Sequence, residues 1–169
     1  FEKMLFPVSR VKWPSTWWGD KELEQKEQAV LSHLKDLLQK PTAAVIMEPL
    51  IQGAGGMAMI RTDFLRKAHA LIRQSGALFI ADEVLTGFGR CGTLFAYQGA
   101  EIKPDLIALS KGLTGGFLPM GVTMASNKVY EAFIDKDPHK TFWHGHSFTA
   151  NPLGCAAANA SLDLLENNP

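Results

Sequence analysis

Ala77-Leu78-Phe79-Ile80-Ala81 is an apolar run that leads directly into Asp82-Glu83-Val84. An uninterrupted apolar run of this length is typical of a strand that is buried on both faces, as in a parallel sheet. Helical spacing extends from Asp63 to Gln74 before it, and Ser75-Gly76 supplies a helix-ending signal between the two. The stretch therefore predicts a helix, a turn and a buried strand that ends in two carboxylates.

The same alternation of helical and strand patterns continues along the chain in both directions. Apolar residues recur at helical spacing from Leu23 to Leu38, and a last helix is expected from about Pro152 to Leu165. Further strands are expected at 43–47, 106–109 and 119–125. Strands that are mostly separated by helices form a largely parallel sheet covered on both faces. The sequence thus predicts an α/β fold with a mostly parallel central sheet flanked by helices.

Composition argues against several classes of partner. The 169 residues carry 17 basic and 17 acidic side chains, and the basic ones form no run, so neither nucleic acid nor an anionic membrane surface is an expected partner. No apolar run approaches the roughly 20 residues that span a bilayer. Cys91 and Cys155 are far apart and form no metal or disulfide pattern. We therefore expect a soluble protein of a reducing, cytoplasmic compartment.

Two residues that follow the predicted strands suggest pyridoxal phosphate chemistry. Asp82 ends the strand at 77–81, and Lys111 lies just beyond the strand at 106–109. A lysine amine can form a Schiff base with an aldehyde cofactor, and an aspartate can keep the pyridinium nitrogen protonated so that the ring withdraws electrons. Either residue alone is more often a turn former or a surface charge. Ligands of such sheets bind beyond the carboxyl ends of strands, where Glu48 falls as well.

Four segments, in their order along the chain, resemble the class III (omega) aminotransferases, which are fold type I enzymes that depend on pyridoxal phosphate. The resemblance implies that residues 1–169 are the central part of the large, cofactor-binding domain, without the N-terminal and C-terminal regions of the enzyme. It also implies a homodimer with shared active sites. The four segments are Met47–Gly56, Asp82–Arg90, Ser110–Gly112 and Trp143–Pro152.

The resemblance gives Lys111 the catalytic role of holding the cofactor, contacting the substrate and moving the proton. Asp82 is expected to bind the ring nitrogen. Successive side chains of a strand point to opposite faces, so Val84 would pack against the ring on the same side as Asp82. Glu83 would then hold neighbouring backbone or an arginine. For Glu48 the family implies a place near the cofactor and the substrate entrance, but a structural acid at a strand end is an equal alternative.

The segment that contains Gly145-His146-Ser147 resembles the one that reaches the cofactor phosphate of a neighbouring subunit. The Ser147 hydroxyl and the turn amides, including that of His146, are the expected phosphate donors, since such groups supply directed hydrogen bonds. Gly145 is expected to contact the substrate. His144 and His146 have a His-x-His spacing, but with no third ligand evident, no metal is expected.

Leu85 departs from most of the family, whose members carry a glutamine there that reaches the phenolic oxygen of the cofactor. An apolar or small residue at this position resembles one branch of the family. That branch transfers an amino group from S-adenosylmethionine to 8-amino-7-oxononanoate, giving 7,8-diaminononanoate in biotin biosynthesis. The alternative within the same chemistry is another omega-aminotransferase, acting on ornithine, acetylornithine, a diamine or beta-alanine.

A different class is represented by Gly53-Ala54-Gly55-Gly56-Met57-Ala58, which fits the Gly-x-Gly-x-x-Ala outline of a dinucleotide-binding turn. Such a turn opens a helix at once, whereas the next helix is expected near Asp63. Asp82 is also later than the acid expected about 20 residues on. A dinucleotide-binding oxidoreductase is therefore the remote alternative, and a non-catalytic binding module leaves the pairing of Asp82 with Lys111 unexplained.

Overall fold

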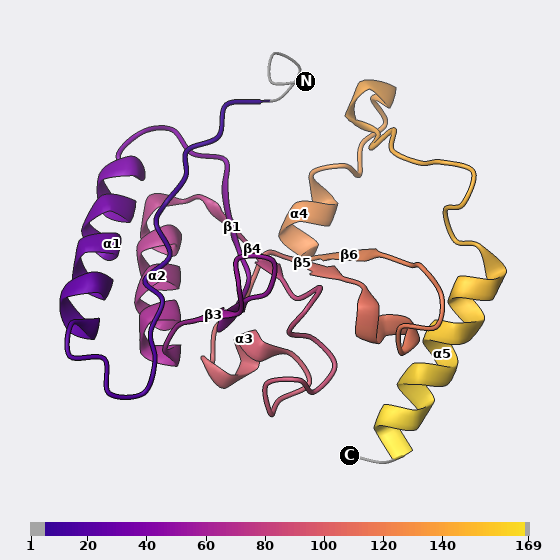
Figure 1. Cartoon of the computed structure of the whole chain (residues 1–169). Coiled ribbons are helices and arrows are strands. Elements are labelled where there is room, and N and C mark those ends of the chain that lie inside the picture. The colour runs from indigo at the N-terminus through magenta and orange to yellow at the C-terminus, as the bar shows by residue number, and fades with distance from the viewer. Residues whose placement is uncertain (1–5, 168–169) are drawn as a thin grey trace.

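The computed structural model describes residues 6–167 as one mixed α/β arrangement, with helices α1 and α2 beside a central sheet and helix α5 at the far end (Figure 1). The larger elements are α1 (Leu23–Leu37), β1 (Ala44–Met47), α2 (Thr62–Ser75), β4 (Leu78–Asp82), β5 (Leu106–Leu109), β6 (Val122–Ala125) and α5 (Pro152–Asn167). The shorter ones are β2 (Ile51–Gln52), β3 (Ala58–Met59), α3 (Ala96–Gly99), the 3-10 turn η2 (Lys111–Thr114), α4 (Asn127–Glu131) and the 3-10 turn η3 (Pro138–Lys140).

The central sheet has the strand order β1-β4-β5-β6. β1, β4 and β5 run parallel, with Ile46 paired to Ile80 and Ile80 paired to Leu106, and β6 runs antiparallel to β5. β2 and β3 form a separate two-stranded hairpin. The predicted mostly parallel sheet is thus confirmed.

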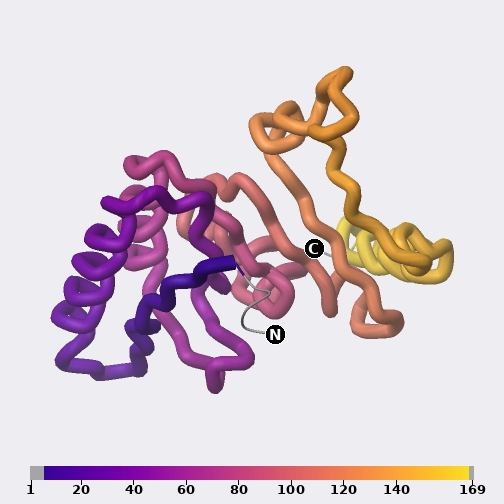
Figure 2. The backbone as a smooth tube through the Cα atoms, turned by 90° about the horizontal axis from the view of Figure 1, so that it is seen from above, coloured from indigo at the N-terminus to yellow at the C-terminus, as the bar shows by residue number. Residues whose placement is uncertain are grey.

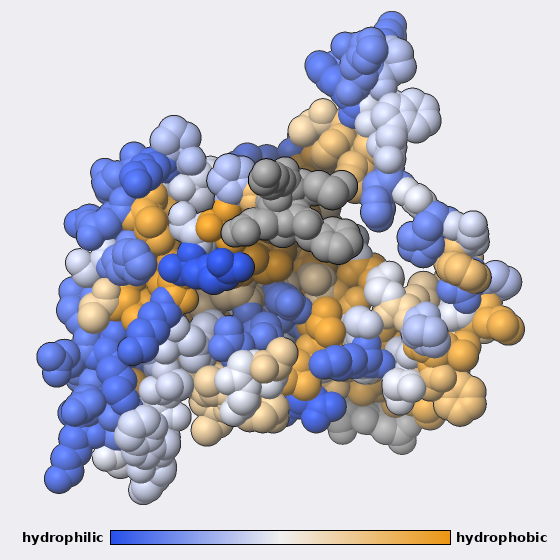
Figure 3. Space-filling view, turned by 45° about the horizontal axis from the view of Figure 1, so that its top comes forward, coloured by the Kyte–Doolittle hydropathy of each residue, from blue (hydrophilic) through white to orange (hydrophobic). Residues whose placement is uncertain are grey.

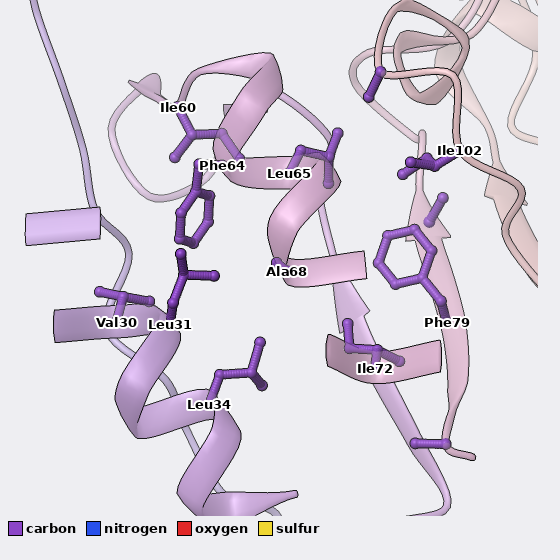
Figure 4. Close-up of a cluster of buried hydrophobic side chains, with 13 residues drawn as sticks. Val30, Leu31, Leu34, Ile60, Phe64, Leu65, Ala68, Ile72, Phe79 and Ile102 are labelled. Atoms are coloured by element: carbon purple, nitrogen blue, oxygen red, sulfur yellow. The ribbon is translucent and has the colours of Figure 1, made fainter. Parts of the chain in front are cut away.

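The hydrophobic core lies between α1, α2 and one face of the sheet (Figure 4). α2 is central because it packs against both α1 and β4, and it ends at Gly76 in a left-handed conformation with φ of 81°, as the Ser75-Gly76 signal predicts. Phe79 and Ala81 point from β4 into this core. Full burial of a large apolar side chain contributes roughly 1.5–3 kcal/mol, so this cluster holds the helices on the sheet. Its largest members are Val30, Leu31, Leu34, Ile60, Phe64, Leu65, Ile72, Phe79 and Ile102.

The opposite face of the sheet is less covered than the sequence predicts. Leu78 and Ile80 alternate with the core residues of β4 and are only half-buried, and Ile46 on β1 is exposed. Within residues 6–167, α1 and α2 lie together on the side of Phe79 and Ala81. In the described part of the chain, α1 and α2 cover one face of the sheet, and the other face is partly covered.

The other elements agree with the sequence apart from their ends. β4 continues to Asp82, and β6 begins at Val122 instead of Pro119, because a proline has no N–H to give to a strand ladder. Asn151 caps α5 by accepting the Gly154 N–H at 2.7 Å. Pro152 stands at the first helical position, where a missing N–H costs nothing.

Residues 127–150 form a segment that leaves the body after β6 and returns at the start of α5 (Figure 2). Nearly all of its side chains are exposed. Its tip is hydrophilic, with apolar surface at its base (Figure 3). We call residues 127–150 the projecting segment.

Asp105 is a buried carboxylate that ties β4 to the start of β5. It accepts the backbone N–H of Phe79 at 2.8 Å and pairs with Arg73 of α2 at 3.3 Å. We expect Asp105→Ala to lower the free energy of unfolding by about 1–3 kcal/mol, because a buried N–H loses its partner. Asp105→Asn, which keeps an acceptor oxygen, should cost less. Urea unfolding measures both, with the exposed Asp36→Ala as the control that stays within about 0.5 kcal/mol.

Candidate functional site

Three of the predicted site residues lie at the carboxyl ends of three adjacent strands. Glu48 follows β1, Asp82 is the last residue of β4, and Lys111 comes just after β5. Asp82 is paired with Ala108, so Lys111 stands three residues beyond that register position on the neighbouring strand. Neighbouring strands are about 4.8 Å apart, so these residues gather at one edge of the sheet.

Asp82 belongs to the less covered face of β4, the face of Leu78 and Ile80. Its Oδ1 accepts the Val84 N–H at 3.1 Å, which fixes the carboxylate in a turn. Within residues 6–167, Oδ2 has no hydrogen-bond partner, and the residue is half-buried. The structure therefore presents a fixed carboxylate with one free acceptor oxygen at the strand end.

Glu83 points the other way and is fully buried, with 0% exposure. Its Oε2 accepts the Thr86 hydroxyl at 2.5 Å and the Ala96 N–H at 3.1 Å, and its Oε1 accepts the Tyr97 N–H at 2.8 Å. The expectation that Glu83 holds neighbouring backbone is confirmed. Burial, and then the negative charge of Glu83, raise the pKa of the Tyr97 phenol and of the Cys91 thiol. The Cys91 thiol is thereby disfavoured as a nucleophile.

Lys111 has a left-handed backbone, with φ of 44° at the first position of η2. A non-glycine residue in this region is strained, and such strain is concentrated at functional sites. The side chain is exposed, and its amine makes no hydrogen bond or ion pair within residues 6–167. The amine is thus available to a ligand.

Glu48 is half-buried and has a backbone partner in the structure. Its Oε2 accepts the Gly53 N–H at 2.8 Å and so ties the end of β1 to the loop that joins β2 and β3. A Cβ built on Gly53 would lie 2.3 Å from Leu85 Cδ2, so the hairpin lies directly against Leu85. The structural role of Glu48 is present, and its contact with cofactor or substrate stays a prediction.

Val84 does not continue the strand. β4 ends at Asp82 and a turn begins at Val84, so the alternation used to place Val84 beside Asp82 does not extend to it. Its contact with the cofactor ring stays a prediction.

The three predicted residues Gly145, His146 and Ser147 lie on the projecting segment. All three are exposed, and the hydrogen bonds of His146 are local: Thr149 Oγ1 accepts the His146 N–H at 3.0 Å. His146 Nδ1 accepts the Phe148 N–H at 3.2 Å. Within residues 6–167, no hydrogen bond joins these three residues to Asp82 or Lys111.

The structure also bears on three other kinds of site or segment: a dinucleotide-binding turn, a metal cluster and a membrane-spanning helix. Residues 53–57 connect β2 and β3 in an antiparallel hairpin and open no helix, which excludes a dinucleotide-binding turn there. Across residues 6–167, no cluster of three or more His, Cys, Asp or Glu side chains could hold a metal ion. No helix in that range is long and apolar enough to cross a bilayer.

Comparison with known proteins decides the family. The profile of the family described as "Aminotransferase class-III" matches residues 1–169. The chain belongs to the class III aminotransferases. It is 57% identical over 166 residues to the adenosylmethionine-8-amino-7-oxononanoate aminotransferase of Synechococcus elongatus, covering 98% of this chain and 39% of the relative. The enzyme of the same name from Helicobacter pylori is 43% identical over 149 residues, covering 88% of this chain and 34% of the relative.

Solved structures agree on the fold of this class III chain. An (S)-enantioselective omega-transaminase from Thermomicrobium roseum has a TM-score of 0.83 at 31% identity, covering 96% of this chain and 38% of that one. A PLP-bound amine transaminase from an uncultivated Pseudomonas species has a TM-score of 0.80 at 31% identity, covering 92% and 36%. The chain thus spans well under half the length of the relatives that it matches.

The sequence did not predict the residues that contact Gly112, the neighbour of Lys111 in the chain. Phe88, from the turn after β4, packs against Gly112, and Ser161 of α5 donates to the Gly112 carbonyl at 3.1 Å. The Ser110-Lys111-Gly112 run shows a glycine at this position, but it does not show which side chain packs against that glycine. Ser161 is 49 residues from Gly112 along the chain, and the sequence around Ser161 carries no local signal of this contact.

We predict that Glu83→Gln destabilises the protein in urea unfolding by about 1–3 kcal/mol, since the amide nitrogen of glutamine cannot accept a hydrogen bond and one of three donors loses its partner. The exposed Glu131→Gln serves as the control and should stay within about 0.5 kcal/mol of the parent. Equal stabilities of the two variants would show that the buried bonds contribute nothing net.

Proposed function

We propose that the protein of which this chain is part is a pyridoxal-phosphate-dependent aminotransferase. It would transfer an amino group from S-adenosylmethionine to 8-amino-7-oxononanoate, giving 7,8-diaminononanoate in biotin biosynthesis. The observation that carries the proposal is the gathering of Asp82 and Lys111 at adjacent strand ends, each with an unused polar group, in a class III chain. The choice of substrates is supported by the names of the relatives from Synechococcus elongatus and Helicobacter pylori.

The residues at this edge fit pyridoxal phosphate. The cofactor needs an amine to hold its aldehyde and an anion beside its ring nitrogen, and Lys111 and Asp82 supply one of each. When bound, the cofactor supplies an electron sink for the carbon that loses its proton. The fixed carboxylate of Asp82 would keep the ring nitrogen protonated. The Lys111 amine, when not holding the cofactor, would serve as the general acid and base.

The proposal also includes the placement of the chain in the enzyme. Residues 1–169 would form the central part of the cofactor-binding large domain of a cytoplasmic homodimer. Ser147, His146 and Gly145 would serve the site of the partner subunit. Their exposure on the projecting segment supports this, and within residues 6–167 the hydroxyl of Ser147 makes no hydrogen bond.

Another omega-aminotransferase is the second candidate, because structural similarity extends to enzymes with other substrates. The ornithine aminotransferase of Toxoplasma gondii has a TM-score of 0.71 at 36% identity, covering 81% of this chain and 31% of that one. A screen of amino donors and acceptors with the full-length enzyme separates the candidates. Turnover with S-adenosylmethionine and 8-amino-7-oxononanoate, and not with ornithine, supports the first; the reverse result supports the second.

We expect Lys111→Ala in the full-length enzyme to lower turnover by at least ~10²–10⁴-fold, the scale of removing a general acid and base. Borohydride reduction of the parent with pyridoxal phosphate should place the label on the peptide that contains Lys111. The exposed Lys35→Ala, on α1, should keep both activity and label. A label on another lysine contradicts the assignment.

Ser147→Ala should weaken cofactor retention by roughly 1.5–3 kcal/mol, because a donor to a charged acceptor is lost. If Ser147 acts across the dimer, a Lys111→Ala/Ser147→Ala heterodimer has one site with both defects and one with neither. Mixing the two preparations, at a cofactor concentration that leaves the Ser147→Ala parent largely empty, should then restore about a quarter of the parental activity, given random exchange within a two-fold dimer. Demonstrated subunit exchange without recovery places Ser147 in its own subunit or off the cofactor.

A further inference from the structure

Gly112, directly after Lys111, has no room for a side chain. A Cβ built on it would lie 2.8 Å from Phe88 Cδ2, 3.0 Å from Phe88 Cβ and 3.1 Å from Phe88 Cγ. Gly112 is not among the residues with a positive φ, so its backbone conformation is open to any residue. Glycine is therefore required here by the Phe88 ring and not by the backbone.

Helix α5 also holds Gly112, through a hydrogen bond to its carbonyl. Ser161 donates its hydroxyl to the Gly112 carbonyl at 3.1 Å, and α5 packs against η2. Within η2, the Gly115 N–H donates to Gly112 O at 3.0 Å and the Gly116 N–H donates to Lys111 O at 2.9 Å. Gly112 is thus contacted by the turn after β4 and by α5, which are far apart in the sequence.

Phe88 is itself held in a strained conformation. Its φ is 63°, which is a true outlier for a bulky side chain. Its ring meets Phe95 edge-on, with centroids 5.7 Å apart, and Phe95 stacks on Tyr97 at 5.9 Å. The backbone N–H of Tyr97 is bound by the buried Glu83. The surroundings therefore fix the ring of Phe88 against Gly112, which is how strain of this kind persists at a functional site.

We infer that Phe88, packed against the Cα of Gly112, and Ser161, bound to its carbonyl, clamp Gly112 and thereby hold the left-handed backbone of Lys111 that aims its amine. Both are positioning residues, since neither is placed at the reacting atoms. The inference rests on the proposed function, in which Lys111 carries the cofactor. It also gives Glu83 a connection to the site through Tyr97, Phe95 and Phe88, although its carboxylate faces away from Asp82.

The first test uses hydrogen exchange in the cofactor-free, full-length enzyme. Ser161→Ala and Phe88→Leu should raise the exchange rates of the Gly115 and Gly116 amides by about tenfold or more, because their acceptors lie on the released turn. In the cofactor-loaded enzyme, kcat should fall roughly ten- to a hundredfold, the scale for a misplaced reacting group, and KM should change less. Asn159→Ala, an exposed change on the same helix, is the control and should alter neither quantity.

The second test is a pair of substitutions at the contact itself. Gly112→Ala should lower kcat because its methyl group meets the Phe88 ring. Phe88→Ala removes the ring atoms that lie at 2.8 and 3.1 Å and leaves the contact with the Phe88 Cβ at 3.0 Å, so the double variant should lose less activity than the product of the two single losses. Losses that multiply independently would show that the ring does not restrict Gly112.

The outcomes separate this inference from the proposed function. If borohydride does not label Lys111 in the parent, the proposed function fails and the clamp has no cofactor to serve. If Lys111 is labelled but Ser161→Ala and Phe88→Leu leave exchange and kcat unchanged, the clamp alone is overturned. Should Phe88→Leu not fold, Ser161→Ala decides, because it removes a single hydroxyl from a half-buried helix position.

Discussion

The buried carboxylate of Glu83 organises the edge of the sheet where the site lies. Its hydrogen bonds to Thr86, Ala96 and Tyr97 close the long turn between β4 and α3. A buried charge is tolerated only when it is satisfied in this way. With the turn closed, Leu85 lies against Gly53 on one side, and Phe88 lies against Gly112 on the other. The turn that Glu83 closes thus supplies Leu85, which lies against the Gly53 bound by Glu48, and Phe88, which lies against the Gly112 that follows Lys111.

The tandem acids show how far local pattern determines the site. Side chains alternate across a strand, so Asp82 and Glu83 had to face opposite sides, and the structure places them so. The sequence also predicted β1, β4, β5, α1, α2 and α5 within a few residues, because buried apolar runs and helical spacing are local signals. The alternation failed one residue further on, at Val84, because the strand had already turned.

Features that depend on distant residues were not predictable in the same way. The antiparallel direction of β6, the left-handed Phe88 and the bond from Ser161 to Gly112 depend on tertiary packing that no window of sequence contains. The bare face of the sheet is also a property of the chain as a whole. Ser147 is a third case, since its proposed ligand belongs to a partner subunit and a single chain shows only its exposure.

The outer strands of the central sheet have a consequence for handling this segment by itself. Within residues 6–167, β1 and β6 each pair along one side only, and Ile46 and Met124 are exposed on them. An unpaired strand edge with apolar side chains is a template for pairing with another chain. Expressed without its flanking sequence, the segment should therefore be prone to edge-to-edge aggregation.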